Sequence, residues 1–208
     1  MILSRLRLAA VAVAGAVLLA GCSGGGADAA FDNDDFVSCI EDAGLSVDGS
    51  SDWSDDEMRA FFSEPAALDC AATELSDGER SEAVQAAFPA TEDFDEAGLD
   101  QRFAPIDALV GYVRADIADL GETEVVARAG RLIDAIEWEP EGTRTEAREQ
   151  VALTVVRETE GVPDYNSWLD EHGVEDDYTG RAKYVTAAQQ DGTPTAEKID
   201  KVVQELEG

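Results

Sequence analysis

The chain has 208 residues, of which 46 are acidic and 15 are basic, so its formal net charge at pH 7 is −31. A surface with this excess of negative charge repels nucleic acid and anionic lipid, and the composition therefore excludes a nucleic-acid-binding function. Hydrophobic residues make up 44% of the chain, which is too much for a disordered acidic tail and enough for a packed core.

The first residues have the pattern of an export signal. Arg5 and Arg7 precede an uncharged apolar stretch at 8–20, which is too short for a membrane-spanning helix of ~20 residues. The stretch leads into the sequence LAGC at 19–22, which resembles the lipobox of bacterial lipoproteins. The resemblance implies cleavage before Cys22 and attachment of lipid, such as palmitate, to this cysteine. An ordinary secretory signal followed by an unrelated cysteine is the alternative.

This resemblance predicts how the N-terminus is divided and where the protein is located. Residues 1–21 would be the signal peptide, and 22–30, which are small and rich in glycine, would be the lipidated cysteine and a flexible tether. Cleavage would remove two arginines and leave 13 basic against 46 acidic residues, a net charge of −33. Lipid on Cys22 would hold the protein to the extracytoplasmic face of the cell membrane, because two or more acyl chains anchor stably.

Two cysteines remain after Cys22, namely Cys39 and Cys70. An even pair of cysteines in an exported chain favours a disulfide. Two separate buried thiols or a metal site are the alternatives, but neither cysteine has a neighbouring histidine or a CxxC motif. The sequence therefore predicts one disulfide in the N-terminal part of the domain.

Residues 31–90 are predicted to form a helical unit that this disulfide cross-links. Apolar residues recur in this range at helical spacing. Gly44 and Pro65 stand where helices commonly end and begin. Residues 54–57 and 76–79 each have the Ser-x-x-Glu pattern of a capping box, which marks the start of a helix.

Residues 91–208 are predicted to form a further helical bundle, which can share one domain with residues 31–90. The acidic stretch 91–105 contains Gly98 and Pro105, so we expect a connection with at most one short helix there. In the rest of the range, apolar residues recur at helical spacing. Because no segment alternates apolar and polar residues with a period of two, we predict an all-α protein of roughly eight to ten short helices.

Several signals divide this second range into helices. Apolar residues follow the helical period over 106–120 and again over 125–136, which predicts two antiparallel helices. A third capping box is expected at 143–146. Asp164 is expected to cap a short helix, and two more helices are expected within 178–206.

The chain contains a single histidine, His172. His172 and Glu175 have the H-x-x-E spacing used by some helical metal-binding lipoproteins, with further acidic residues beside them. Both side chains would face one metal ion only in a continuous helix, yet Gly173 favours a helix end at this point. They are therefore weak candidates for a metal site, and we predict no metal or other cofactor.

Four aromatic residues near the C-terminus are weak candidates for ligand binding: Tyr165, Trp168, Tyr178 and Tyr184. They could line a groove for a glycan or a peptide. Aromatic residues at helical spacing are more often part of the core of a small helical bundle. The sequence does not decide between these two interpretations.

Three functions from different classes are compatible with these features. Because signatures of enzymes are missing, we expect a noncatalytic interaction or accessory module of the cell envelope, bound to an unidentified envelope protein. A lipoprotein that binds divalent cations or a small ligand is the first alternative, since acidic residues are abundant. An envelope hydrolase that uses His172 and nearby carboxylates is the second.

Overall fold

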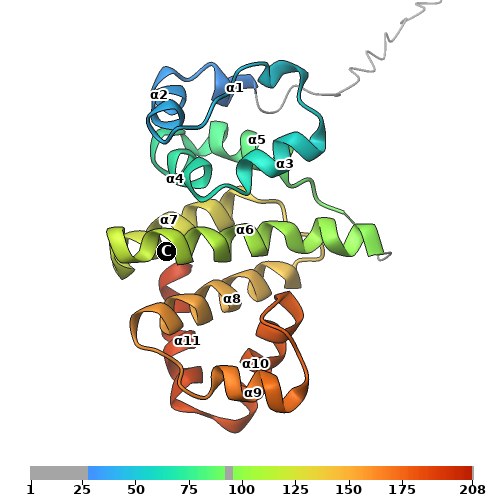
Figure 1. Ribbon diagram of the computed structural model, residues 1–208, viewed down its shortest axis with the longest axis vertical. Helices are drawn as coiled ribbons and strands as arrows, with labels where there is room; N and C mark the ends of the chain where they lie inside the picture. Colours follow the sequence, from blue (N-terminus) through green and yellow to red (C-terminus); the bar gives the residue numbers. More distant parts are fainter. Residues whose placement is uncertain (1–27, 92–95, 208) are drawn as a thin grey trace, which may run out of the picture.

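The computed structural model describes residues 28–91 and 96–207. The predicted signal peptide and Cys22 lie outside this range. In the described residues the chain forms eleven α-helices, one short 3₁₀-helix and no strand. The predicted all-α fold is therefore confirmed, with one α-helix more than the eight to ten expected. The helices stack along the long axis of the molecule, with α1–α5 at one end, α6 and α7 across the middle and α8–α11 toward the other end (Figure 1).

The N-terminal layer contains five α-helices and the 3₁₀-helix. They are α1 (Asp28–Phe31), α2 (Asp34–Asp42), η1 (Ser50–Asp52), α3 (Asp55–Phe62), α4 (Pro65–Glu74) and α5 (Asp77–Ala87). Helix α1 thus includes the last residues of the tether expected at 22–30, and Ala30 is completely buried. The predicted disulfide between Cys39 and Cys70 is confirmed. It joins α2 to α4 with the two Cα atoms 5.8 Å apart.

Local sequence chemistry explains where these helices begin. The Asn33 side chain accepts hydrogen bonds from two backbone N–H groups in the first turn of α2. Both capping boxes predicted at 54–57 and 76–79 are confirmed, because serine and glutamate in each accept a hydrogen bond from the other's backbone N–H. Each box satisfies two donors that the start of a helix would otherwise leave unpaired. Gly44 follows α2 with a φ of 79°, which glycine adopts without steric cost.

Replacing Ser54 by alanine should lower the free energy of unfolding by ~1 kcal/mol, because the first turn of α3 loses its side-chain acceptor. Ser38→Ala is the matched control, since Ser38 is an exposed residue inside α2. Urea unfolding followed by circular dichroism measures both variants. Equal stability of the two would contradict the capping role of Ser54.

The same capping box links the stability of α3 to pH. Hydrogen bonds from the backbone N–H and then the hydroxyl of Ser54 lower the pKa of Glu57 below its ordinary value of 4.5. A carboxyl group whose pKa is lowered by folding stabilises the fold above its unfolded pKa, and this contribution is lost as the pH falls through the lowered value. The difference in stability between the wild type and Ser54→Ala should therefore shrink as the pH falls below 4.5.

The middle layer consists of α6 (Glu96–Leu120) and α7 (Glu122–Ala135), which are separated by Gly121. The predicted connection over 91–105 is wrong from residue 96 onward, because α6 continues through Pro105. A proline inside a helix removes one backbone donor and costs ~3 kcal/mol. However, Pro105 is buried and α6 packs against α4, α7 and α8. Tertiary packing therefore outweighs the local penalty.

The next helix, α8 (Gly142–Thr159), begins before the capping box expected at 143–146, and that box is absent. Thr143 is the second residue of α8 and is only 1% exposed. Its hydroxyl accepts a hydrogen bond from Arg102 Nε at 3.1 Å and donates one to the Glu139 carbonyl at 3.5 Å. The hydroxyl is thus used in packing α8 against α6, and no side-chain cap forms.

The C-terminal helices are α9 (Tyr165–His172), α10 (Tyr178–Asp191) and α11 (Pro194–Leu206). Helix α11 lies along α7 and α8, and Gly130 in α7 permits a close approach to the Leu206 backbone. Buried apolar side chains form one continuous core from Ala30 to Leu206, which joins the units expected at 31–90 and 91–208. Within the described ranges, no helix combines the length and the apolar character needed to cross a membrane.

Candidate functional site

The arginines of the described residues are held by the fold itself. All ten make a side-chain hydrogen bond or an ion pair with a neighbouring group. Residues 31–90 contain sixteen acidic residues but only Arg59 and Arg80 as basic ones, and Arg80 is buried against the carbonyl groups at the end of α4. The N-terminal layer therefore presents an anionic surface.

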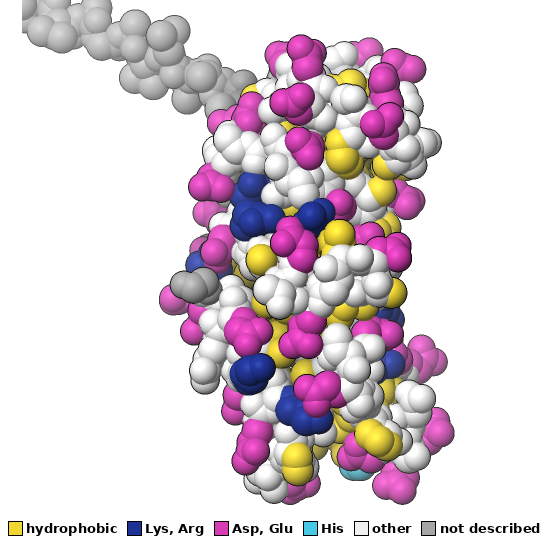
Figure 2. Space-filling model, turned by 90° about the vertical axis from the view of Figure 1, so that its left-hand side faces the viewer, with side chains coloured by type: hydrophobic (Ala, Val, Ile, Leu, Met, Phe, Trp, Pro, Cys, Tyr) yellow, Lys and Arg dark blue, Asp and Glu magenta, His cyan; other side chains and the backbone are white. Residues whose placement is uncertain are grey.

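The space-filling view of one face agrees with this distribution (Figure 2). Acidic side chains cover the face from end to end, whereas basic side chains form small groups in its middle and lower parts, each beside acidic neighbours. The upper end, which the N-terminal helices form, shows acidic and no basic side chains on this face. Hydrophobic side chains are exposed only as small, scattered patches. This face is therefore predominantly anionic.

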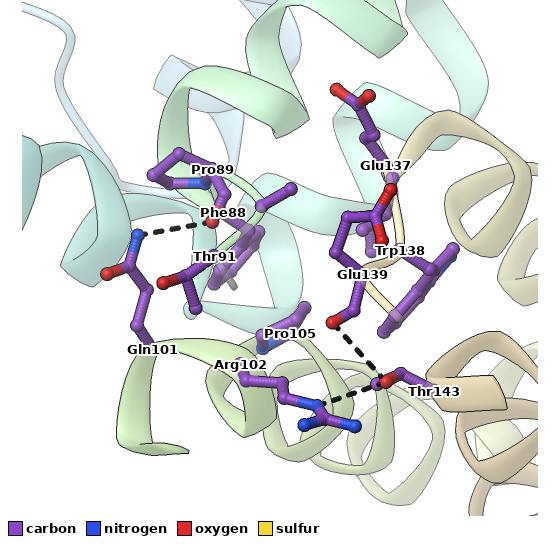
Figure 3. Close-up of a pocket in the computed structure, with 12 residues that line it drawn as sticks. Phe88, Pro89, Thr91, Gln101, Arg102, Pro105, Glu137, Trp138, Glu139 and Thr143 are labelled. Carbon is purple, nitrogen blue, oxygen red and sulfur yellow. Dashed lines mark hydrogen bonds between the residues drawn. The ribbon is translucent and has the colours of Figure 1, made fainter. Parts of the chain in front are cut away.

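A narrow hollow lies between the end of α5, α6 and the segment before α8 (Figure 3). Its walls include Phe88, Pro105 and Trp138. The polar groups in this wall already bond to one another, since Thr143 lies between Arg102 and the Glu139 carbonyl. The free space is about 10 Å³, which is about enough for one water molecule. This hollow is part of the packing and has no room for a ligand.

A larger, open hollow lies between the first half of α6 and the start of α10, and we call it the acidic groove. Its volume is about 420 Å³, within the usual range of ligand-binding clefts. Seven residues line it: Asp100, Phe103, Ala104, Asp107, Asp177, Tyr178 and Thr179. The four from α6 are spaced i, i+3, i+4 and i+7, which places them on one face of that helix. The other three are the N-cap and first residues of α10.

A stacked aromatic pair joins the two sides of the acidic groove. The rings of Phe103 and Tyr178 have their centres 3.6 Å apart and their planes 16° apart. Both side chains are half-buried. The Tyr178 hydroxyl donates a hydrogen bond to Glu146 in α8, and burial followed by this contact raises the pKa of Tyr178. Tyr178 therefore stays neutral at physiological pH, with its ring held against α6.

The three carboxylates of the groove differ in the hydrogen-bond and ion-pair partners that they have in the fold. Asp107 pairs with the buried guanidinium of Arg181, which also donates to Gln150 Oε1 at 2.8 Å. Asp177 caps α10 by accepting from the Gly180 N–H at 2.8 Å. Asp100 makes no hydrogen bond or ion pair within the described part of the chain. Asp100 and Asp177 are both exposed, and neither has a cationic partner among the described residues.

A second carboxylate network fixes the segment that carries Asp177 and Tyr178. Asp176 accepts hydrogen bonds from Tyr165 at 2.7 Å, from Arg114 at 3.0 Å and from Arg157 at 3.1 Å. Burial raises the pKa of Asp176, but the Tyr165 hydroxyl and the two arginines outweigh it and leave the pKa lowered. The carboxylate stays ionised and connects α6, α8 and α9 directly beside the groove.

Three of the four aromatic candidates come together, and the fourth does not. Tyr184 makes edge contacts with Tyr165 and Trp168, with ring centres 4.8 and 5.3 Å apart. Tyr165 and Tyr184 are buried and Trp168 is half-buried, so this group is mainly packing between α9 and α10. Tyr178 lies apart from it, in the acidic groove. Asp164 occupies the predicted cap position of α9, but its side chain caps no N–H and instead accepts from Tyr184 at 3.4 Å.

His172 and Glu175 do not lie on one helix. Helix α9 ends at His172, and Gly173 follows with a φ of 63° in the left-handed region. The His172 ring stacks on Trp168 with centres 4.0 Å apart, and its Nδ1–H donates to the Trp168 carbonyl at 2.8 Å. In the ranges described, no group of three or more potential ligands is arranged to hold a metal ion.

The remaining members of the acidic groove were not expected from the sequence. Asp100 and Phe103 fall in the stretch 91–105 that was interpreted as a connection. Their spacing with Ala104 and Asp107 is helical, and this is the signal that could have found them. The glycine and proline of the stretch pointed to a loop instead.

Comparison with known proteins identified no match for this chain. No protein-family model, no curated protein and no solved structure matches this chain. The chemistry of the described surface is therefore the basis for inferring a function.

Proposed function

We propose that the chain is a lipid-anchored, extracytoplasmic lipoprotein that acts as a noncatalytic interaction module of the cell envelope and binds a basic protein partner. The observation that carries this proposal is the distribution of charge. All ten described arginines are engaged within the fold, while acidic residues outnumber basic ones by 46 to 15 in the chain. The exposed charge that is left to meet a partner is therefore mostly negative.

A basic partner fits this surface for a physical reason. A single exposed ion pair contributes only ~0.2–1 kcal/mol, but a whole surface of one sign speeds the encounter with a surface of the other sign. The same field repels nucleic acid and anionic polymers. The disulfide and the continuous core support a preformed surface, which loses little conformational entropy when it binds.

The surroundings of His172 favour a noncatalytic role over the hydrolase alternative. Its ring is exposed, stacks on Trp168 and gives its Nδ1–H to a backbone carbonyl. A histidine that acts as a general base needs a nucleophile or a water within hydrogen-bond reach, oriented by a further group. Among the described residues, the side-chain hydrogen bond that His172 makes is the one to Trp168.

The start of the fold supports attachment through Cys22. Residues 23–27 separate Cys22 from α1, and such a segment can span at most about 20 Å. Helix α1 lies at one end of the stack, whereas α9 and α10 lie at the opposite end (Figure 1). An anchor on Cys22 would keep the N-terminal layer near the membrane, and the C-terminal helices would point toward other envelope proteins.

Cross-linking in intact host cells tests this proposal. The chain carries an affinity tag after Gly208, and its cross-linked partners are identified in the membrane fraction and then tested as purified proteins for direct binding. We expect an envelope protein with an exposed basic segment, bound less tightly as salt is raised. The control is Cys22→Ser, which should incorporate no labelled palmitate and leave the membrane fraction. Palmitate labelling that persists in this variant would refute the anchor, and a purified partner that fails to bind would refute the interaction module.

A further inference from the structure

We propose that Asp116 is a proton-binding group in the junction of α4, α6 and α7, and that proton uptake there holds the N-terminal layer more firmly on the middle layer as the pH falls. The proposal starts from a buried carboxylate oxygen that has no partner, at a place where the neighbouring arginine is already bonded to two other carboxylates. It goes beyond the proposed function and does not depend on it.

The side chain of Asp116 is half-buried in the second half of α6. Its Oδ2 atom is buried and accepts no hydrogen bond within the described part of the chain. Burying a polar atom without a hydrogen bond costs free energy, and the cost is larger when the group carries a charge. A protonated carboxyl group loses the charge and gains an O–H donor. The surroundings of Oδ2 therefore favour the protonated form over the ionised one.

The arginine beside Asp116 is Arg128 of α7, and it already has two carboxylate partners. Its Nη1 atom lies 2.7 Å from Asp69 Oδ1 of α4, and its Nε atom lies 2.7 Å from Glu124 Oε1 of α7. The Tyr112 hydroxyl, whose pKa is raised by burial, donates to the same Asp69 oxygen at 3.1 Å. One guanidinium thus faces three carboxylates, and Asp116 is the carboxylate to which it makes no bond.

The charges around Asp116 act in the same direction as its burial. Burial, followed by the negative charges of Asp69 in α4 and Asp119 in α6, raises the pKa of Asp116 above its ordinary value of 3.8. Arg128 opposes this effect without cancelling it. Helices α8 and α10 also pack against α6, but within the described ranges they contribute no charge that acts on Asp116. Because these ranges contain no group of three ligands arranged for a metal ion, a proton is the cation that can neutralise Asp116.

Proton uptake at Asp116 should stabilise the fold in acid. A carboxyl group whose pKa is raised by folding binds its proton more tightly in the folded state, so its ionisation destabilises the fold. This cost is absent below the unfolded pKa, near 3.8, and complete above the raised value. The contribution of Asp116 to stability should therefore increase as the pH falls through the raised value. The contribution of Glu57 has the opposite sign and is lost in acid.

The position of Asp116 determines which part of the fold responds. Helix α4 belongs to the N-terminal layer and packs against both α6 and α7 (Figure 1). Tyr112, one turn before Asp116 in α6, is completely buried and bonds across this contact to Asp69. Repulsion between Asp116 and Asp69 therefore acts between the N-terminal layer and the middle layer. Neutralising Asp116 removes that repulsion and strengthens the contact between the two layers.

Thermal melting of Asp116→Asn over a series of pH values tests the inference. The protein is the chain from residue 22 onward made without lipid, which contains every described residue. Asparagine has nearly the shape of a protonated aspartate and carries no charge. At pH 7 we expect the variant to melt about 2–4 °C above the wild type, because an unpaired, partly buried charge has been removed. The difference should shrink as the pH is lowered to about 4.5, because the wild type then takes up its own proton.

Asp100→Asn is the matched control. It is the same substitution in the same helix and removes the same formal charge, but Asp100 is exposed. Its melting temperature should stay within about 1 °C of the wild type at pH 7. The further increase shown by Asp116→Asn then measures the burial and the neighbours of Asp116 and not the net charge of the protein.

Nuclear magnetic resonance gives a second readout, because the carboxyl carbon of Asp116 reports its own titration. We expect a midpoint above 3.8 in the wild type. Asp119→Asn should lower this midpoint, because one of the two negative neighbours is gone. Asp119 is exposed, so this variant should keep its fold, and a purely structural role of Asp116 would not move the midpoint.

Three results would overturn the inference. The first is an Asp116→Asn variant that is no more stable at pH 7 than Asp100→Asn. The second is a difference from the wild type that stays constant as the pH falls. The third is a midpoint for Asp116 at or below 3.8. If Asp116→Asn does not fold, the titration of Asp116 in the wild type and in Asp119→Asn still decides the proposal.

Discussion

Replacing Gly180 by alanine should lower the free energy of unfolding by ~3 kcal/mol or more. Gly180 lies in the first turn of α10, and a Cβ atom placed there would be only 1.9 Å from the Glu175 carbonyl oxygen. Leu169 Cδ2 would lie 3.3 Å away on another side. Because the nearest atom belongs to the backbone, the segment between α9 and α10 must move. This movement would also pull Asp176 away from its three donors.

The matched control for this variant is Gly111→Ala. Gly111 lies inside α6, and nothing is within 4 Å of the position of its Cβ. Alanine there should stabilise the fold by about 0.5–1 kcal/mol, because glycine is the poorer helix former. Urea unfolding measures both variants. Opposite signs are expected, and a neutral Gly180→Ala would show that the segment between α9 and α10 is free to relax.

Features that depend on a few neighbouring residues could be predicted from the sequence. The boxes at 54–57 and 76–79 act over three positions, so their residue types are sufficient to locate the starts of α3 and α5. The same pattern failed at 143–146, because Arg102 from α6 uses the Thr143 hydroxyl. A local motif is therefore reliable only where no distant side chain competes for the same atoms.

Features that depend on distant residues could not be predicted in this way. Phe103 and Tyr178 stack although they are far apart in the chain. Pro105 pointed to a loop because its local penalty is visible in the sequence, whereas the packing of α4, α7 and α8 around α6 is not. The aromatic candidates do not form one group for a related reason. Helix α9 ends before Gly173 and α10 begins after Asp177, so the candidates lie on two helices and share no helix face.

Removing the disulfide should have the largest effect on the N-terminal layer. The variant Cys39→Ser with Cys70→Ala should lower the free energy of unfolding by about 3–4 kcal/mol, because a cross-link over 31 positions restricts the unfolded chain. Serine suits position 39, which is half-buried, and alanine suits position 70, which is only 2% exposed. Urea unfolding of the variant measures the loss, and the wild type in reductant is an independent comparison.

The stability lost with the disulfide should also depend on salt. A loss caused by poorer packing of apolar side chains alone would not be reduced by screening of charges. Residues 31–90 contain sixteen acidic and two basic residues, so repulsion opposes the compact N-terminal layer once the link between α2 and α4 is gone. The screening length falls from ~10 Å at 0.1 M salt to ~3 Å at 1 M. Raising sodium chloride from 0.1 to about 1 M should therefore stabilise the variant more than the wild type.

Hydrogen exchange shows where the variant is destabilised. The amides of α2, α3 and α4 should lose protection before those of other helices, since α8 and α11 pack together without them. A variant within about 1 kcal/mol of the wild type, with unchanged exchange in α2, would contradict both the cross-link's contribution and the role of repulsion.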